Sequence, residues 1–173
     1  MPFTIRPYQD ADKSHIITLM RAFNEYIESI DTKNRTAYKE GGAEYFTNKM
    51  LELCATKQGT IFVACDGDKP IGFISGYVDE QDEDEKMETI PAIPGVLGEF
   101  FVLENYRGQK VGKQLLATME NYLREQNCTI IRFPVFAPNT LARTFYEHEG
   151  YVERLIYVLK ELSEASESDV LKR

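Results

Sequence analysis

The chain has 173 residues, of which 43% are hydrophobic and 12% aromatic, and this composition suits one globular domain with a sizeable core. Its 28 acidic residues outnumber its 20 lysines and arginines, so the net charge of −8 argues against a nucleic-acid partner. No run approaches the roughly 20 apolar residues of a membrane span, and the N-terminus lacks a signal peptide's apolar core. We therefore expect a cytoplasmic protein without a membrane partner.

The three cysteines, Cys54, Cys65 and Cys128, are far apart and lie in apolar segments. No Cys-x-x-Cys or Cys/His pattern accompanies them. The sequence therefore predicts reduced core thiols and no metal site.

The N-terminal third predicts a short strand followed by two helices. Phe3 to Arg6 reads as the strand, and apolar residues recur at helical spacing from Asp12 onward. Residues 29–42 are polar and read as a loop, and residues 46–57 repeat the helical spacing.

Two β-rich runs come next, at Thr60 to Cys65 and Pro70 to Val78, joined by Asp66-Gly67-Asp68-Lys69. This linker has the composition of a hairpin turn, so we expect antiparallel neighbours. The acidic stretch at residues 79–88 allows two interpretations. It is either a solvated loop, or a segment that overhangs the acceptor site and attracts a cationic amine by long-range electrostatics.

Residues 98–116 change from an apolar, aromatic strand to a helix through a cationic turn that contains glycine. Gly108 and Gly112 permit close approach of a ligand, and the free amides of the first helical turn suit a phosphate or pyrophosphate. Three cations add positive charge: Arg107, Lys110 and Lys113. A P-loop is excluded, because only three residues separate Gly108 from Gly112 and Gln114 replaces the required hydroxyl.

The C-terminal third predicts three more elements. Cys128 to Phe136 reads as a strand, although Pro134 disfavours a continuous interior strand. Thr140 to His148 reads as a short helix, and Tyr151 to Leu159 as a closing strand. We expect a single domain over residues 1–160 and an acidic, flexible tail over residues 161–173.

Two of these segments resemble motifs of the GNAT superfamily of N-acetyltransferases. The first is a Glu-Leu-Tyr-Val-like strand and an Arg/Gln-x-x-Gly-x-Gly/Ala loop, here Glu99 to Val102 and Arg107 to Gly112. Lys110 departs from it, because it stands where the first motif glycine usually lies. The second, Asn-x-x-Ala-x-x-Phe-Tyr-x-x-x-Gly-Tyr/Phe, is matched at every fixed position from Asn139 to Tyr151.

The resemblance implies the α+β GNAT fold, a mixed, mostly antiparallel and splayed sheet flanked by helices. It implies acetyl-CoA as the acyl donor, with its pyrophosphate on the loop and its pantetheine arm along the strand. The residues implied for acetyl-CoA are Phe100, Phe101, Val102, Arg107, Gly108, Gln109, Lys110, Val111, Gly112, Lys113, Asn139 and Tyr146.

Two residues are candidates for acid and base roles. Tyr146 matches the family tyrosine that can protonate the departing thiolate; otherwise it is a core aromatic. Glu99 is the candidate general base, because its apolar neighbours would raise the pKa of its carboxyl group. Its other reading is a strand residue that points to solvent or pairs with a lysine. Asn139 either caps the following helix or contacts the cofactor arm.

The expected reaction transfers an acetyl group from acetyl-CoA to a primary amine, on a small molecule or a peptide, by direct attack. A cationic acceptor is favoured, and a homodimer is one assembly that the resemblance allows. Two other functions stay open: a non-catalytic acyl-CoA binding or sensing module, and a toxin-like or partner-bound interaction module on the same fold.

Overall fold

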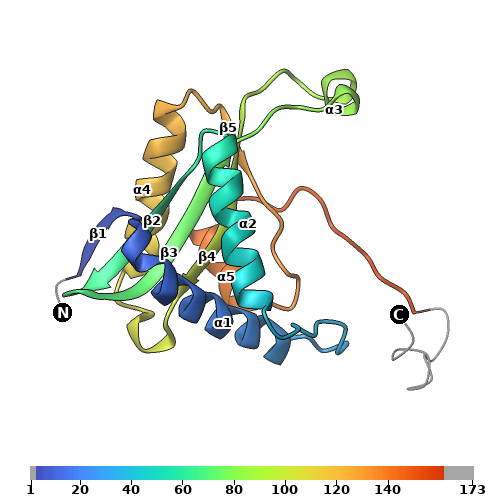
Figure 1. Cartoon of the computed structure of the whole chain (residues 1–173). Helices are drawn as coiled ribbons and strands as arrows, with labels where there is room; N and C mark the ends of the chain where they lie inside the picture. The colour runs from blue at the N-terminus through green and yellow to red at the C-terminus, as the bar shows by residue number, and fades with distance from the viewer. Residues whose placement is uncertain (1–2, 162–173) are drawn as a thin grey trace.

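The computed structural model describes residues 3–161. Its strands are β1 (Thr4–Pro7), β2 (Thr60–Asp66), β3 (Lys69–Val78), β4 (Pro94–Val102) and β5 (Ile130–Arg132). Its helices are α1 (Lys13–Ser29), α2 (Gly42–Thr56), α3 (Glu83–Glu88), α4 (Val111–Glu125) and α5 (Thr140–His148), with 3-10 turns at Asp10–Asp12 (η1) and Glu104–Tyr106 (η2) (Figure 1). Within residues 3–161, no helix has the length and apolar character needed to cross a membrane.

The five strands form one sheet in the order β1-β2-β3-β4-β5. The first three pairings are antiparallel, and β4 and β5 are parallel. The β2–β3 hairpin turns where it was predicted, with Gly67 in the left-handed region at φ +58°. The mixed, mostly antiparallel sheet predicted from the sequence is confirmed.

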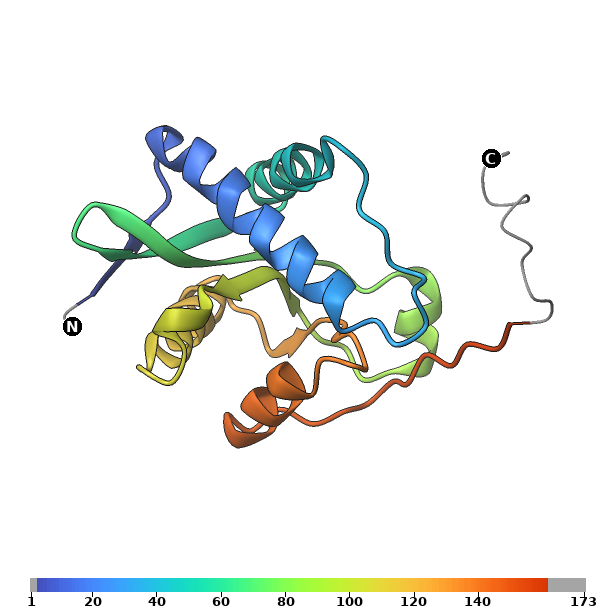
Figure 2. The same cartoon turned by 90° about the horizontal axis from the view of Figure 1, so that it is seen from below.

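Helices cover both faces of the sheet (Figure 2). The alternation of side chains along β2 explains how, because Ile61, Val63 and Cys65 face the α1/α2 layer while Ala64 faces α4. Each layer encloses its own hydrophobic core. Ile16, Met20 and Met50 belong to the α1/α2 core, and α4 contributes fully buried Leu115, Leu116, Met119 and Leu123 to the other.

The end of the sheet opens after three pairs between β4 and β5. Val96 and Arg132 form the last pair, after which β4 continues to Val102 without β5 beside it. Pro134 follows closely on β5 and has no amide proton to donate, which explains why pairing does not resume there. The strand predicted over Cys128 to Phe136 is therefore limited to three residues, and the splay expected from the resemblance is present.

Two further predictions were wrong. Residues 151–159 form no strand, because they lie beside no other strand in residues 3–161. The acidic stretch is not a plain loop: it contains α3, which Asp82 and Glu85 cap reciprocally. Arg132 of β5 then pairs with Glu85 of α3 and with Asp79, which directly follows β3. The predicted tail lies outside the described residues from position 162 onward.

Candidate active site

The open edge of β4 is the centre of the candidate site. Leu103 donates its amide to Ile71 of β3, and Glu99 donates its amide to the Ser75 hydroxyl, so the amides of odd-numbered residues point toward β3. Successive amides of a strand alternate in direction. Those of Phe100 and Val102 therefore point into the opening, where a ligand with amide groups could pair with them.

A bulge shapes β4 at the start of this opening. The register with β3 shifts between Ile74 and Gly76, which face Phe100 and Leu97 respectively. Gly98 is required here, because a Cβ on it would lie 2.5 Å from Ser75 Oγ. Ser75 Oγ also receives the Glu99 amide at 2.8 Å. The Gly98–Ser75 contact thus lies at the bulge, directly before Glu99 in β4.

The turn before α4 has the geometry of an anion site. Gly108 and Lys110 adopt left-handed conformations, with φ of +75° and +67°, and α4 begins at Val111. The amides of Val111, Gly112 and Lys113 belong to the first turn of this helix, where amides have no acceptor within the helix. At Gly112 a Cβ would meet its nearest neighbour, Phe100, at an ordinary 3.5 Å. The fold therefore does not require glycine at this position.

The side chains of this turn have partners of their own. Lys113 Nζ lies 2.8 Å from a carboxylate oxygen of Glu149, and Gln109 donates to the Asn105 carbonyl at 2.9 Å. Arg107 points inward, since its Nε donates to the Val102 carbonyl at 3.1 Å. Whether these side chains contact acetyl-CoA stays a prediction.

An aromatic and polar bridge crosses the opening. The Arg107 guanidinium lies 4.9 Å from the centre of the Tyr26 ring and 5.6 Å from that of Phe101. The Tyr26 hydroxyl donates to Asn139 Oδ1 at 3.1 Å, and the same oxygen accepts the Ala142 amide at 3.1 Å. Asn139 therefore caps α5, as one of its two predicted roles requires, and it also links α5 to α1.

Glu99 lies on the α1/α2 side of the sheet, half-buried. Burial raises the pKa of its carboxyl group, and the positive charge of Lys49 on α2 partly opposes this shift. Burial also raises the pKa of the Tyr38 hydroxyl, as do the negative charges of Glu99 and Glu28. These shifts indicate that two carboxylates and a tyrosine share one region between α1, α2 and β4.

Tyr146 lies on the other side, in an aromatic cluster. Its ring centre is 6.3 Å from that of Phe100, 4.6 Å from that of Phe133 and 5.6 Å from that of Tyr151. Burial raises the pKa of its hydroxyl well above 10. Within residues 3–161, Thr47 Oγ1 is the one fully buried side-chain nitrogen or oxygen atom without a hydrogen-bond partner. The Tyr146 hydroxyl is therefore not a fully buried, unpartnered group.

Four residues near the opening were not identified from the sequence: Tyr26, Tyr38, Lys49 and Ser75. They come from α1, the α1–α2 loop, α2 and β3. The Tyr26–Asn139 bond joins residues 113 positions apart, and Ser75 and Glu99 are 24 positions apart. No local pattern could have revealed these contacts.

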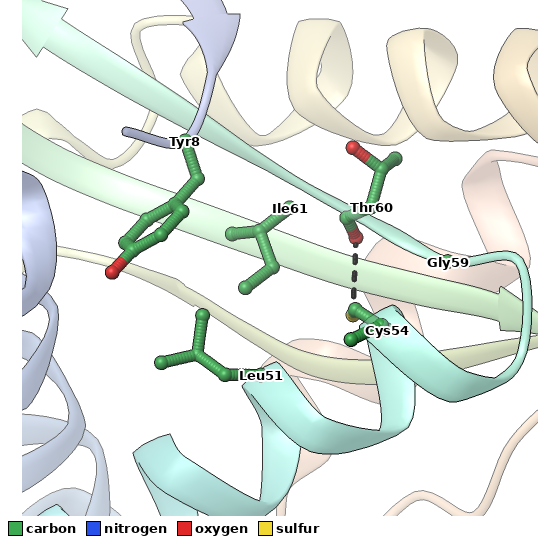
Figure 3. A pocket seen from close by; sticks show the side chains of 7 residues that line it. Tyr8, Leu51, Cys54, Gly59, Thr60 and Ile61 are labelled. Atoms are coloured by element: carbon green, nitrogen blue, oxygen red, sulfur yellow. Dashed lines mark hydrogen bonds between the residues drawn. The ribbon is translucent and has the colours of Figure 1, made fainter. Parts of the chain in front are cut away.

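A separate cavity of about 190 Å³ lies between the end of α2 and β2 (Figure 3). Its lining includes Tyr8, Leu51, Cys54 and Ile61, and the Cys54 thiol lies 3.5 Å from the Thr60 carbonyl. Burial raises the pKa of this thiol to about 11, so it stays protonated at neutral pH. The cavity is two strands away from the β4 opening and contains no charged side chain.

The family follows from a match to residues 23–151, which fit the model of the acetyltransferase (GNAT) family. This match covers both motifs and most of the chain. The chain belongs to the GNAT family of acetyltransferases. It is thus an acyl-CoA-dependent N-acetyltransferase with acetyl-CoA as co-substrate, as its sequence motifs predicted.

Known relatives of this GNAT enzyme include an uncharacterized N-acetyltransferase of Methanocaldococcus jannaschii, MJ1530. It is 28% identical over 129 residues, which are 74% of this chain and 73% of the relative. The aminoglycoside enzyme AAC(6')-Iy, solved with a bisubstrate analogue, has a TM-score of 0.66 and 18% identity over 93% of this chain and 99% of its own. The structure of glucosamine-6-phosphate N-acetyltransferase from Arabidopsis thaliana has a TM-score of 0.63 and 15% identity. The match covers 94% of this chain and 100% of that enzyme. At 18% and 15% identity, these two solved structures show that this chain has the same fold as they do.

Proposed function

We propose that this enzyme acetylates a cationic primary amine by direct attack, with the two substrates on opposite faces of β4. The observation that carries the proposal is the open edge of β4 beyond Val96, with Glu99 on the α1/α2 side and Tyr146 on the α4/α5 side. When bound, acetyl-CoA supplies a thioester whose acyl carbon is the electrophile. The chain's own residues hold and activate the partners.

Glu99 is the proposed general base. It accepts a proton from the acceptor amine, directly or through one water molecule. Burial raises the pKa of Glu99, which brings its basicity closer to what proton removal near neutral pH requires. Ser75 fixes its backbone, so the bulge is the positioning element for this side chain.

Tyr146 is the proposed acid. Its raised pKa keeps the hydroxyl protonated at neutral pH, so it has a proton to direct at the leaving sulfur. The Phe100 amide, which points into the opening, is the proposed donor to the carbonyl oxygen as negative charge develops there. Phe100, Phe101 and Val102 act through their main chain, and the Phe101 side chain instead packs against Phe23 at 5.6 Å.

The pyrophosphate is proposed to bind at the first turn of α4. The amides of Gly108 to Lys113 supply donors, and the positive end of the helix dipole favours an anion. Lys110 is exposed and adds positive charge. Lys113 can do so after leaving Glu149, and Arg107 after leaving the Val102 carbonyl. Asn139, which is almost fully buried, is proposed to offer its amide nitrogen to the cofactor arm while its oxygen caps α5.

The acceptor is proposed to enter from the side of Tyr38, where the ring contacts Phe46 with centres 5.8 Å apart. The charges of Glu99 and Glu28 both act on Tyr38. Two carboxylates beside an aromatic pair favour a positively charged amine over a neutral one. AAC(6')-Iy and the glucosamine-6-phosphate enzyme carry names of amine acceptors, in keeping with this class.

Calorimetry of acetyl-CoA binding tests the cofactor site. Gly112→Asp should abolish binding, because it places a negative charge over the amides that would hold the pyrophosphate. The matched control is Gly112→Ala, which the fold tolerates at ordinary contact distance. If Gly112→Asp and the wild type bind acetyl-CoA equally, the pyrophosphate does not bind at this turn.

Steady-state rates across pH, measured as free thiol released with a panel of amines, test the base. The carboxylate form of Glu99 is the active one, so the wild-type rate should rise as pH increases through a pKa above 4.5. Glu99→Gln should lower kcat by about 100-fold and abolish this rise of the rate with pH. Its affinity for acetyl-CoA should be unchanged. Glu25→Gln, an exposed acid on α1, is the control.

A double variant, Glu99→Gln with Tyr146→Phe, separates catalysis from simple binding. Full turnover in this variant would refute both catalytic roles. Acetyl-CoA binding without thiol release by the wild type, for every amine tried, would favour a sensing module on the same fold.

A further inference from the structure

A tyrosine of α1 reaches α5 across the open end of the sheet. Tyr26 lies near the end of α1, and its hydroxyl donates to Asn139 Oδ1 at 3.1 Å. Figure 2 shows the segment before α5 passing beside the end of α1. α1 packs on one face of the sheet, whereas Phe145 and Tyr146 of α5 pack into the core on the other. The Tyr26–Asn139 bond therefore joins the two sides of the opening.

This bond fixes the direction of the Asn139 side-chain amide. The backbone amide of Ala142 can only donate, so its 3.1 Å contact identifies the accepting atom of Asn139 as the oxygen. The Tyr26 hydroxyl donates to the same oxygen. Two donors on one oxygen oppose rotation of the amide more strongly than the helix cap alone would. The amide nitrogen, Nδ2, is therefore held in one direction as well.

Asn139 Nδ2 has hydrogen-bonding capacity that the protein does not use. Asn139 is only 8% exposed, yet its Nδ2 donates to no other group of residues 3–161. This nitrogen is not sealed, because Thr47 Oγ1 is the one fully buried, unpartnered side-chain nitrogen or oxygen in that range. A nearly buried amide nitrogen without an acceptor is costly. A ligand that brings a carbonyl oxygen to Nδ2 would remove this cost.

The ring of Tyr26 borders the open edge of β4. The Arg107 guanidinium lies 4.9 Å from the ring centre, and its Nε donates to the Val102 carbonyl at 3.1 Å. The carbonyl of a strand residue points to the same side as its amide, so the Val102 carbonyl faces the opening. Tyr26 therefore connects the open edge of β4 to Asn139, by its ring on one side and its hydroxyl on the other.

We propose that Tyr26 is a positioning residue for acetyl-CoA, an inference that rests on the proposed path of the cofactor arm along β4. Its hydroxyl holds the Asn139 oxygen, so that Nδ2 donates to an amide carbonyl of the pantetheine arm. Tyr26 itself does not touch the substrate. A residue of the α1/α2 layer thus serves the acyl donor, and the affinity for the amine acceptor does not depend on its hydroxyl.

Tyr26→Phe tests this role, because it removes the hydroxyl and keeps the ring beside Arg107. Calorimetry on the full chain should show the Kd for acetyl-CoA raised about tenfold, as expected for one lost hydrogen bond. The KM for acetyl-CoA should rise by the same factor, while kcat and the KM for the amine stay at wild-type values. Unchanged acetyl-CoA affinity, or an equal rise in both KM values, would overturn the proposal.

Tyr122→Phe is the matched control. The Tyr122 hydroxyl donates to the Gln58 carbonyl, also at 3.1 Å, and Tyr122 lies near the end of α4 that is remote from the proposed pyrophosphate turn. This variant loses a comparable hydrogen bond between two elements, so its stability changes in a similar way. It should bind acetyl-CoA with wild-type affinity. Equal weakening by the two variants would make the effect one of stability and overturn the proposal.

A double-mutant cycle tests whether Tyr26 acts through Asn139. Asn139→Ser retains a cap for α5 but removes Nδ2, and it should also raise the Kd for acetyl-CoA about tenfold. Adding Tyr26→Phe to this variant should raise the Kd no further, because the group that Tyr26 positions is already gone. Independent effects, which would multiply to about 100-fold, would overturn the proposal.

A shorter donor separates this role from the pyrophosphate site. S-acetylpantetheine keeps the arm and lacks the pyrophosphate, so Tyr26→Phe should lower kcat/KM by the same factor with it as with acetyl-CoA. A loss confined to acetyl-CoA would overturn the proposal. If Gly112→Asp abolishes acetyl-CoA binding and Tyr26→Phe does not weaken it, the role of Tyr26 fails and the pyrophosphate site stands. The opposite result leaves Tyr26 in its role and removes the pyrophosphate site.

Discussion

Lys110 is the residue at which this chain departs most clearly from its family motif. Its backbone is left-handed, at φ +67°, directly before α4. This conformation costs a residue with a Cβ about 1 kcal/mol, and glycine adopts it freely. The lysine therefore provides a positive charge beside the proposed pyrophosphate site at the expense of stability.

Replacing this residue should separate the two effects. Lys110→Gly should raise the free energy of unfolding by about 0.5 kcal/mol, after the greater entropy of glycine in the unfolded chain is counted. The same variant should bind acetyl-CoA more weakly at low salt, with a smaller salt dependence. Urea unfolding and calorimetry measure the two quantities. Lys39→Gly, an exposed lysine in the loop before α2, is a control for charge alone.

At this scale the sequence predicted the motif residues but not their neighbours. Four residues were identified because their types lie at characteristic positions of the two motif segments: Gly108, Gly112, Asn139 and Tyr146. The inward position of Arg107 was not, because it depends on the Tyr26 ring and the Val102 carbonyl, which meet only in the folded chain. The same limit applied to Ser75 at the bulge.

The junction of β1 with α1 depends on an ion pair between the buried Asp12 and the half-buried Arg6. Asp12 accepts two hydrogen bonds from the Arg6 guanidinium, at 2.7 and 2.8 Å, and one from the Gln9 amide at 2.9 Å. The Arg6 hydrogen bonds lower the pKa of the Asp12 carboxyl group below 3.8. The carboxylate thus fixes the edge strand to the first helix.

Asp12→Ala should lower the free energy of unfolding by about 2 kcal/mol near neutral pH, because it leaves the Arg6 charge and the Gln9 amide unpaired. The folded-state pKa is depressed, so this contribution is present above pH 4 and is lost as pH falls below that value. Chemical unfolding at a series of pH values measures it. If the variant and the wild type differ equally at pH 3 and pH 7, the ion pair is not the cause. Asp10→Ala, at an exposed position beside it, is the control.

Most helices and strands were predictable because their signal is local. The spacing of Ile16, Met20 and Ile27 was enough for α1, and Thr140–His148 was predicted with the bounds that α5 has. The failures involve pairing. Residues 151–159 have strand composition without a neighbouring strand, and β5 is short because Pro134 interrupts its edge. For α3 a local signal existed, the capping pair Asp82 and Glu85, but the acidic composition hid it.

Electrostatics act over the whole molecule. The chain carries a net charge of −8, while the turn before α4 is cationic. An acidic protein attracts a cationic acceptor, and salt screens that attraction. The exposed acids of α3 add to this field, although Glu85 is engaged with Arg132.

The KM for a cationic amine should rise about threefold when salt increases from about 0.05 M to about 0.5 M, and that for a neutral amine should not change. Asp84→Asn with Glu88→Gln should raise the same KM at low salt only. Asp10→Asn with Asp68→Asn removes equal charge near β1 and the β2–β3 turn, away from α3 (Figure 1). If both double variants raise the KM for the cationic amine equally, the position of α3 has no special effect and only the total charge matters.

The two hydrophobic cores lie on opposite faces of the sheet, one between α1, α2 and the strands, the other around α4. The proposed acceptor region belongs to the first layer and the proposed cofactor turn to the second. Substitutions on the α1/α2 side, apart from Tyr26 with its bond to Asn139, can therefore accumulate without disturbing the α4 layer. Over evolutionary time such a molecule can change the amine that it accepts while the means of holding its acyl donor stays the same.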